Sequence, residues 1–177
     1  MDLAAELLSS FLKRSKEYKT LGDKTFAQLD GEQMHRQPND ASNSIAIIIR
    51  HLHGNMLSRW TNFLKEDGEK SWRNREEEFE VQTLSKDALL LLWEEGWKMF
   101  LATLESLQKE DLLKTITIRT QPLIVVDAIN RQLAHYSYHV GQIVYLGRWM
   151  KEGGWQSLTI PKGGSTAYNE KLQNGKR

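Results

Sequence analysis

The sequence has no cysteine among its 177 residues. This absence excludes disulfide bonds, thiolate metal ligands and cysteine nucleophiles. A chain of this length that folds without disulfides is typical of the cytoplasm, where we expect the protein to reside. Any thiol chemistry must therefore use a thiol from outside the chain.

The sequence also lacks an excess of charge and a long apolar run. Its 24 Lys and Arg residues nearly balance its 23 Asp and Glu residues, which leaves a net charge of +1. A nucleic-acid partner needs a concentrated basic field, so none is expected. The longest apolar run is the six residues from Ala88 to Trp93, whereas a membrane-spanning helix needs about 20. Asp2 and Glu6 stand where a signal peptide carries positive charge, so neither export nor a membrane partner is predicted.

Apolar residues recur at helical spacing in four segments. These segments span about residues 2–21, 43–66, 85–107 and 125–152. Ser85 is a suitable N-cap for the third segment, and Gly153 and Gly154 follow the fourth as a stop signal. The pattern predicts an all-α fold, a four-helix bundle with one long crossover.

The first two connections are less regular. Residues 22–42 contain Gly22 and Pro38 and predict a loop with a short helical turn. Residues 67–84 are rich in charge and predict a solvated crossover.

The remaining segments flank the last helix. Residues 114–119 alternate apolar and polar side chains, as a short strand does. Residues 123–126 follow Pro122, and they either pair with that strand in a short β-hairpin or lead into the helix. Residues 156–177 are expected to form a surface tail on a single domain of residues 1–177.

The histidines are the most informative polar residues. His135 and His139 are one helical turn apart, so both imidazoles lie on one face within reach of a single ion. That face also holds five mostly apolar neighbours, Ala128, Gln132, Ile143, Leu146 and Met150. Burying two imidazoles costs free energy unless each finds a partner, and one divalent cation would satisfy both. Two hydrogen-bonded core histidines, or a partly exposed pair, are the alternatives.

A third ligand must come from another helix, and the second helix offers His51 and His53. The two point nearly opposite ways. Periodicity favours His53 as the more buried, whereas His51 shares its face with polar residues such as Asn55 and suits a reactive site. The pattern alone leaves the choice open.

Three stretches resemble a known family. They are Ser42–Ala46, Arg50–Asn55 and the run His135-Tyr-Ser-Tyr-His139-Val-Gly-Gln142. Together they resemble the DinB-like superfamily of bacterial four-helix-bundle metalloproteins, and the ending Ser157–Gly164 is similar to an uncharacterised branch of it.

The resemblance implies a divalent-metal site made of His51, His135 and His139, with His53 as the alternative if the helix is rotated. Zinc and nickel are the metals it implies, and three neutral imidazoles suit either. Gln142 lies near the histidine face and is expected to orient a ligand or a bound water, with a plain surface glutamine as the alternative. We expect Gly141 to permit close helix approach.

By the same resemblance, the expected activity is metal-dependent transfer of a low-molecular-weight thiol (bacillithiol, mycothiol or glutathione) to a small-molecule electrophile. Asn55 is expected near the open coordination position. Glu95 is a weak acid–base candidate, and the acidic run Glu76–Glu78 is interpreted as solvated surface, so no catalytic side chain is assigned. The alternatives are a stress-related metal- or ligand-binding bundle without turnover and a metal-dependent hydrolase.

Family members of this type often pair through helix faces. Trp60, Trp72 and Trp149 are expected to supply exposed aromatic surface, which favours a homodimer.

Overall fold

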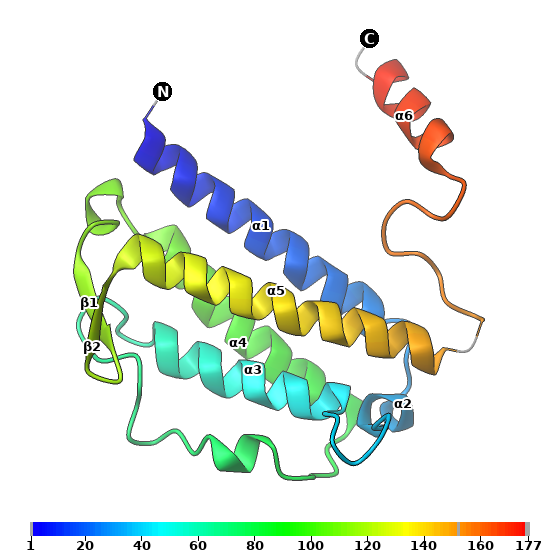
Figure 1. Cartoon of the computed structure of the whole chain (residues 1–177), viewed down its shortest axis with the longest axis horizontal. Helices are drawn as coiled ribbons and strands as arrows, with labels where there is room; N and C mark the ends of the chain where they lie inside the picture. Colours follow the sequence, from blue (N-terminus) through cyan, green and yellow to red (C-terminus); the bar gives the residue numbers. More distant parts are fainter. Residues whose placement is uncertain (1, 152, 176–177) are drawn as a thin grey trace.

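Four long helices dominate the computed structural model, which describes residues 2–151 and 153–175. They lie alongside one another (Figure 1) and are α1 (Leu3–Phe26), α3 (Ile45–Trp60), α4 (Lys86–Ser106) and α5 (Val125–Met150). Both α3 and α1 contact α4 and α5. The helical class predicted from periodicity is confirmed.

A two-stranded antiparallel hairpin precedes α5. It consists of β1 (Thr115–Ile118) and β2 (Gln121–Ile124), with Thr117 opposite Pro122. The predicted hairpin is therefore present, but Pro122 lies inside the second strand rather than before it. Proline is accepted there because each strand of a two-stranded hairpin has a free edge.

The shorter helical elements are α2 (Gly31–His35), η1 (Glu76–Glu78), η2 (Lys109–Asp111) and α6 (Ser165–Asn174). Helix α6 was not predicted, and none of its residues is buried. The tail prediction also covers residues 176–177, which lie outside the described residues, as does residue 152 at the predicted end of α5.

Helix α1 continues past Gly22, where a loop was predicted. A Cβ atom at position 22 would overlap the indole ring of Trp93 on α4. The glycine therefore allows close contact between α1 and α4 within a continuous helix, and it does not end the helix.

Helix α3 ends at Trp60, earlier than the predicted residue 66. Thr61 adopts an extended conformation and Asn62 has a φ of 50°. The Ser58 hydroxyl donates a hydrogen bond of 2.7 Å to the carbonyl of Gly68, and the Arg59 guanidinium donates to the same oxygen. These buried bonds hold the chain where it turns back into the crossover.

The core between α3, α4 and α5 is aromatic. Trp60 is 1 % exposed, so the prediction that it forms exposed surface is wrong, whereas Trp72 and Trp149 are exposed as expected. The Trp60 indole N–H donates to the Tyr136 hydroxyl at 2.8 Å, and that hydroxyl donates to Asn55 Oδ1 at 3.1 Å. This buried chain of hydrogen bonds ties α5 to α3 one residue from His135.

The length and hydropathy of the helices determine whether any of them could span a membrane. Within the described residues, every helix is too short or too polar to cross a bilayer.

Candidate metal centre

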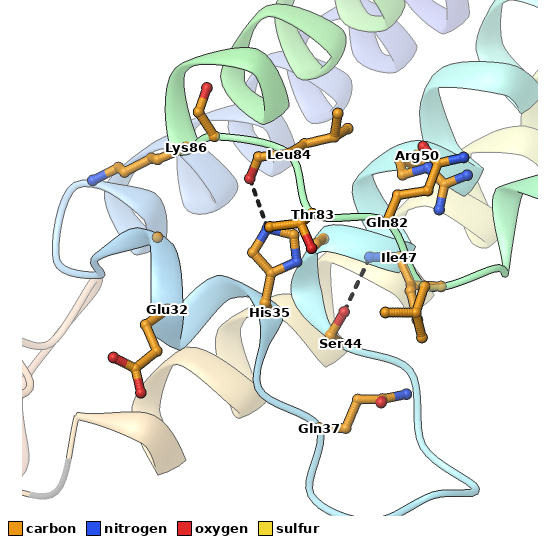
Figure 2. A pocket seen from close by; sticks show the side chains of 14 residues that line it. Glu32, His35, Gln37, Ser44, Ile47, Arg50, Gln82, Thr83, Leu84 and Lys86 are labelled. Atoms are coloured by element: carbon orange, nitrogen blue, oxygen red, sulfur yellow. Dashed lines mark hydrogen bonds between the residues drawn. The ribbon is translucent and has the colours of Figure 1, made fainter.

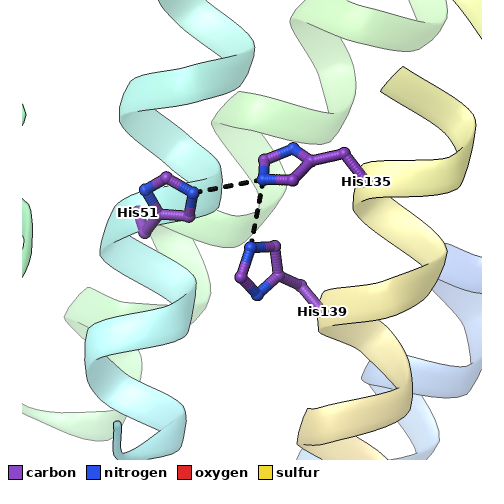
Figure 3. Close-up of side chains that lie close together, drawn as sticks. All are labelled: His51, His135 and His139. Carbon is purple, nitrogen blue, oxygen red and sulfur yellow. Dashed lines mark hydrogen bonds between the residues drawn. The ribbon is translucent and has the colours of Figure 1, made fainter. Parts of the chain in front are cut away.

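The structure brings together three histidines from two helices. His51 lies on α3, and His135 and His139 lie on α5 (Figure 3). The Nε2 atom of His135 is 3.3 Å from Nε2 of His51 and 3.1 Å from Nε2 of His139. One ligand atom from each histidine lies within 4.8 Å of the others, so the group could hold a metal ion.

These separations suit a tetrahedral ion. Zinc–nitrogen bonds of about 2.0 Å at tetrahedral angles place two ligand nitrogens about 3.3 Å apart. The two distances from His135 Nε2, to His51 Nε2 and to His139 Nε2, are close to that value before any side chain moves.

The outer nitrogen of His51 is held by a carboxylate. Its Nδ1–H donates to Glu78 Oε2 at 2.9 Å, and both side chains are buried. Arg73 donates to the two oxygens of Glu78 at 2.7 and 2.9 Å. Because Glu78 accepts from Nδ1, Nε2 of His51 carries the lone pair that faces the cluster.

His139 is held in the same way by an amide. Its Nδ1–H donates to Gln142 Oε1 at 2.8 Å, one turn further along α5. Its Nε2 therefore also presents a lone pair to the centre. Sequence reasoning expected Gln142 to orient a ligand or a bound water, and here it contacts His139.

The three inner nitrogens cannot satisfy one another in the absence of an ion. With Nδ1 of His51 and of His139 protonated, only His135 can carry a proton on Nε2. That single N–H must serve two acceptors at 3.3 and 3.1 Å. A divalent cation would accept all three lone pairs at once, and the donor set thus fits such an ion.

The environment keeps His135 and His139 neutral. Burial, followed by the neighbouring His139 and His51, lowers the pKa of His135 to about 3. Burial also lowers the pKa of His139 to about 4, against the opposing effect of its bond to Gln142. Neutral imidazole is the form that binds metals, so the site is ready for a cation at neutral pH.

The sequence was also compared with known proteins. A family model described as "Protein of unknown function (DUF1572)" matches residues 2–164. The chain belongs to the DUF1572 family. The matched residues include all three clustered histidines and end before α6. Neither curated proteins nor solved structures gave a match.

In this DUF1572 chain the other α3 histidine lies outside the cluster. His53 Nε2 contacts the carboxylate of Glu95 on α4 at 2.9 Å, and the Glu95 side chain is 62 % exposed. The expectation from periodicity that His53 is the more buried is wrong, because the crossover covers His51 instead. Glu95 does not enter the histidine cluster.

Two other predicted residues lie on α3 and α5. Asn55 is buried, and its side-chain oxygen accepts from Tyr136. Gly141 has no atom within 4 Å of a Cβ built on it, so it does not mediate a close helix contact. That contact is made at Gly147, where a Cβ would overlap Thr25 of α1.

The cavity beside α2 and the end of the crossover does not contain the cluster (Figure 2). Its basic side chains already have partners in the protein. His35 Nε2 contacts the carbonyl of Leu84 at 2.8 Å, Lys86 donates to the carbonyl of Leu29 at 2.6 Å, and Arg50 donates to the carbonyls of Glu77 and Glu80. These bonds fix the crossover to α2 and α3, so we interpret this cavity as structural.

Glu78 is the residue that sequence reasoning missed. The run Glu76–Glu78 was interpreted as solvated surface, which is correct for Glu76 and Glu77 and wrong for Glu78. A Cβ at position 54 would overlap the Glu78 carboxylate, so Gly54 lets Glu78 approach α3. Bonds from His51 and Arg73 hold the pKa of Glu78 below its usual value, although burial opposes them, and the carboxylate stays charged.

Glu78→Gln is expected to weaken Zn²⁺ binding about 10- to 100-fold, since a carboxylate behind a ligating histidine raises the basicity of the ring. Competition with a chromophoric chelator measures the affinity. The matched control is Glu77→Gln, which changes an exposed neighbour and leaves His51 untouched. Equal affinities in the two folded variants would show that Glu78 does not support the metal site.

Proposed function

We propose that this protein is a metal-dependent transferase that moves a low-molecular-weight thiol onto a small-molecule electrophile. The observation that carries the proposal is the cluster of three histidines whose Nε2 atoms face one another. Two of these rings are oriented by hydrogen bonds from Nδ1, to Glu78 for His51 and to Gln142 for His139. Packing of the four long helices and the resemblance of the histidine motifs support a DinB-like four-helix bundle as the scaffold.

His51, His135 and His139 would hold zinc or nickel, and three protein ligands leave a coordination position open. When bound, the ion supplies a positive charge that favours the thiolate form of a thiol at that position. Glu78 and Gln142 fix the orientation of two rings and hold the single proton of each neutral ring on Nδ1, which leaves Nε2 to bind the ion. The absence of cysteine is consistent with a nucleophile that comes from outside the chain.

In the proposed reaction the thiol gives its proton to solvent and its sulfur forms a bond to an electrophilic carbon. The electron pair displaced at that carbon leaves with a leaving group, or in an addition moves into the substrate and takes up a proton.

The test begins with protein purified without an affinity tag and loaded with one equivalent of Zn²⁺ or Ni²⁺. Glutathione, bacillithiol and mycothiol are each incubated with a small electrophile, and thioether formation is followed by mass spectrometry. We expect formation to exceed the background rate at least tenfold with one of the thiols, and to fall to background in His135→Ala. Hydrolysis without thiol would replace the proposal with a metal-dependent hydrolase. Stoichiometric metal without turnover would replace it with a non-catalytic binding protein.

Assembly and location are part of the same proposal. The exposed rings of Trp72 and Trp149 support pairing of two copies as a homodimer. The lack of cysteine supports a cytoplasmic location.

A further inference from the structure

A second cavity lies between the start of α3 and the middle of α5, and none of the three clustered histidines is among its lining residues. Its volume is about 450 Å³. Its walls include Ser42 and Asn43 from the loop before α3 and Tyr138, Gln142 and Tyr145 from α5.

Two of these wall residues contact His139 directly. Gln142 Oε1 accepts the hydrogen bond from His139 Nδ1 at 2.8 Å. The ring of Tyr138 lies 4.9 Å from the ring of His139 in an edge-on arrangement. A molecule in this cavity therefore touches the residues that orient His139.

The lining selects against charge. Among the described residues, the cavity wall contains no Lys, Arg, His, Asp or Glu side chain. Burying a charged group there would cost free energy without an opposite charge to compensate. The free carboxylates of a thiol such as glutathione are poor occupants for this reason.

The lining also favours a particular kind of ligand. Tyr138, Tyr145 and Ile48 line the cavity, and their rings and aliphatic side chain suit a flat or apolar body. The amide NH₂ groups of Asn43 and Gln142 make no hydrogen bond to the described residues, since Gln142 uses its oxygen on His139. Two free amide donors beside aromatic rings match a carbonyl oxygen on an apolar molecule.

We infer that this cavity is a binding site for an uncharged small molecule with an aromatic or apolar body and a carbonyl oxygen. That this molecule is the electrophile of the transfer rests on the proposed function. The preference for an uncharged carbonyl compound rests only on the cavity lining.

The probes are benzylideneacetone, an uncharged aromatic enone, and cinnamate, which has a similar skeleton and a carboxylate. Binding is measured by calorimetry without thiol, so that no turnover occurs. We expect benzylideneacetone to bind at least tenfold more tightly than cinnamate. Tyr145→Ala, at a side chain that is 73 % exposed, should weaken its binding at least fivefold and leave the metal content unchanged. The matched control is Tyr168→Ala in α6, outside the cavity, which should bind as the wild type does.

Equal binding of the two probes, equal affinity in the two tyrosine variants, or no binding of benzylideneacetone would overturn the inference. The same titration on metal-free protein separates it from the proposed function. If the metal-free protein binds the probes selectively and the metal-loaded protein shows no turnover, the cavity inference is supported and the transferase is contradicted. Turnover by the metal-loaded protein without selective binding would give the reverse result.

Discussion

His135→Ala is expected to weaken Zn²⁺ or Ni²⁺ binding about 1,000-fold, which is a loss of about 4 kcal/mol. His135 is the central member of the cluster, because its Nε2 lies within 3.3 Å of the corresponding atom of both other histidines. Without it, the remaining pair consists of one ligand from each helix, and two protein ligands hold a divalent ion weakly. Elemental analysis of purified protein and chelator competition measure the change.

The matched control for this prediction is His53→Ala. His53 is a histidine on α3 that contacts Glu95 outside the cluster, so its removal should leave metal content and affinity unchanged. If His135→Ala retains the wild-type metal content, or if His53→Ala loses the metal, the assignment of the three ligands is incorrect.

The α5 half of the cluster could be predicted from sequence because it depends only on helix geometry. A spacing of one turn places His135 and His139 on one face, and the apolar neighbours on that face direct it inward. The structure shows both rings facing the cluster, with His139 buried. The hydrogen bond that His139 donates to Gln142 follows from the same local geometry, since the two residues are three apart on the helix.

The α3 half could not be predicted in this way. Periodicity compares the apolar and polar faces of a helix, and it favoured His53. His51 is 6 % exposed because the crossover folds over it, with Glu78 on its Nδ1 and the ring of Phe79 at 5.0 Å. A helix pattern contains no information about which irregular segment will cover it. The motif resemblance, rather than periodicity, selected His51.

The contact of Glu78 with His51 could not be predicted from the sequence for a related reason. Glu78 stands in a run of three glutamates whose other members are exposed, and only the short η1 helix turns its side chain inward. Its pairing with Arg73 and its approach to Gly54 depend on the path of the crossover. The early end of α3 at Trp60 has the same origin, since it is set by bonds to Gly68 in that crossover.

The metal-free protein is expected to lose about 3 kcal/mol of unfolding free energy between pH 6.5 and 4.5 through His135 and His139. Their pKa values are about 3 and 4 in the folded state and about 6.5 in the unfolded chain. As the pH falls below 6.5, the unfolded chain binds two protons that the folded protein does not, so stability that is present above pH 6.5 is lost. The two shifts correspond to about 4 kcal/mol over this window, and we expect about 3 kcal/mol because both rings keep some contact with water.

Urea denaturation in the presence of a chelator measures this loss. The control is the double variant His135→Gln/His139→Gln, which keeps polar side chains at both positions but cannot take up the protons. The difference in unfolding free energy between wild type and this variant should shrink or change sign as the pH falls, and most carboxyl groups titrate only below this window. Metal-loaded wild type should resist acid better than the metal-free protein, because the bound ion blocks both nitrogens. Parallel pH profiles for the metal-free wild type and the double variant would mean that the two histidines are not buried as neutral ligands.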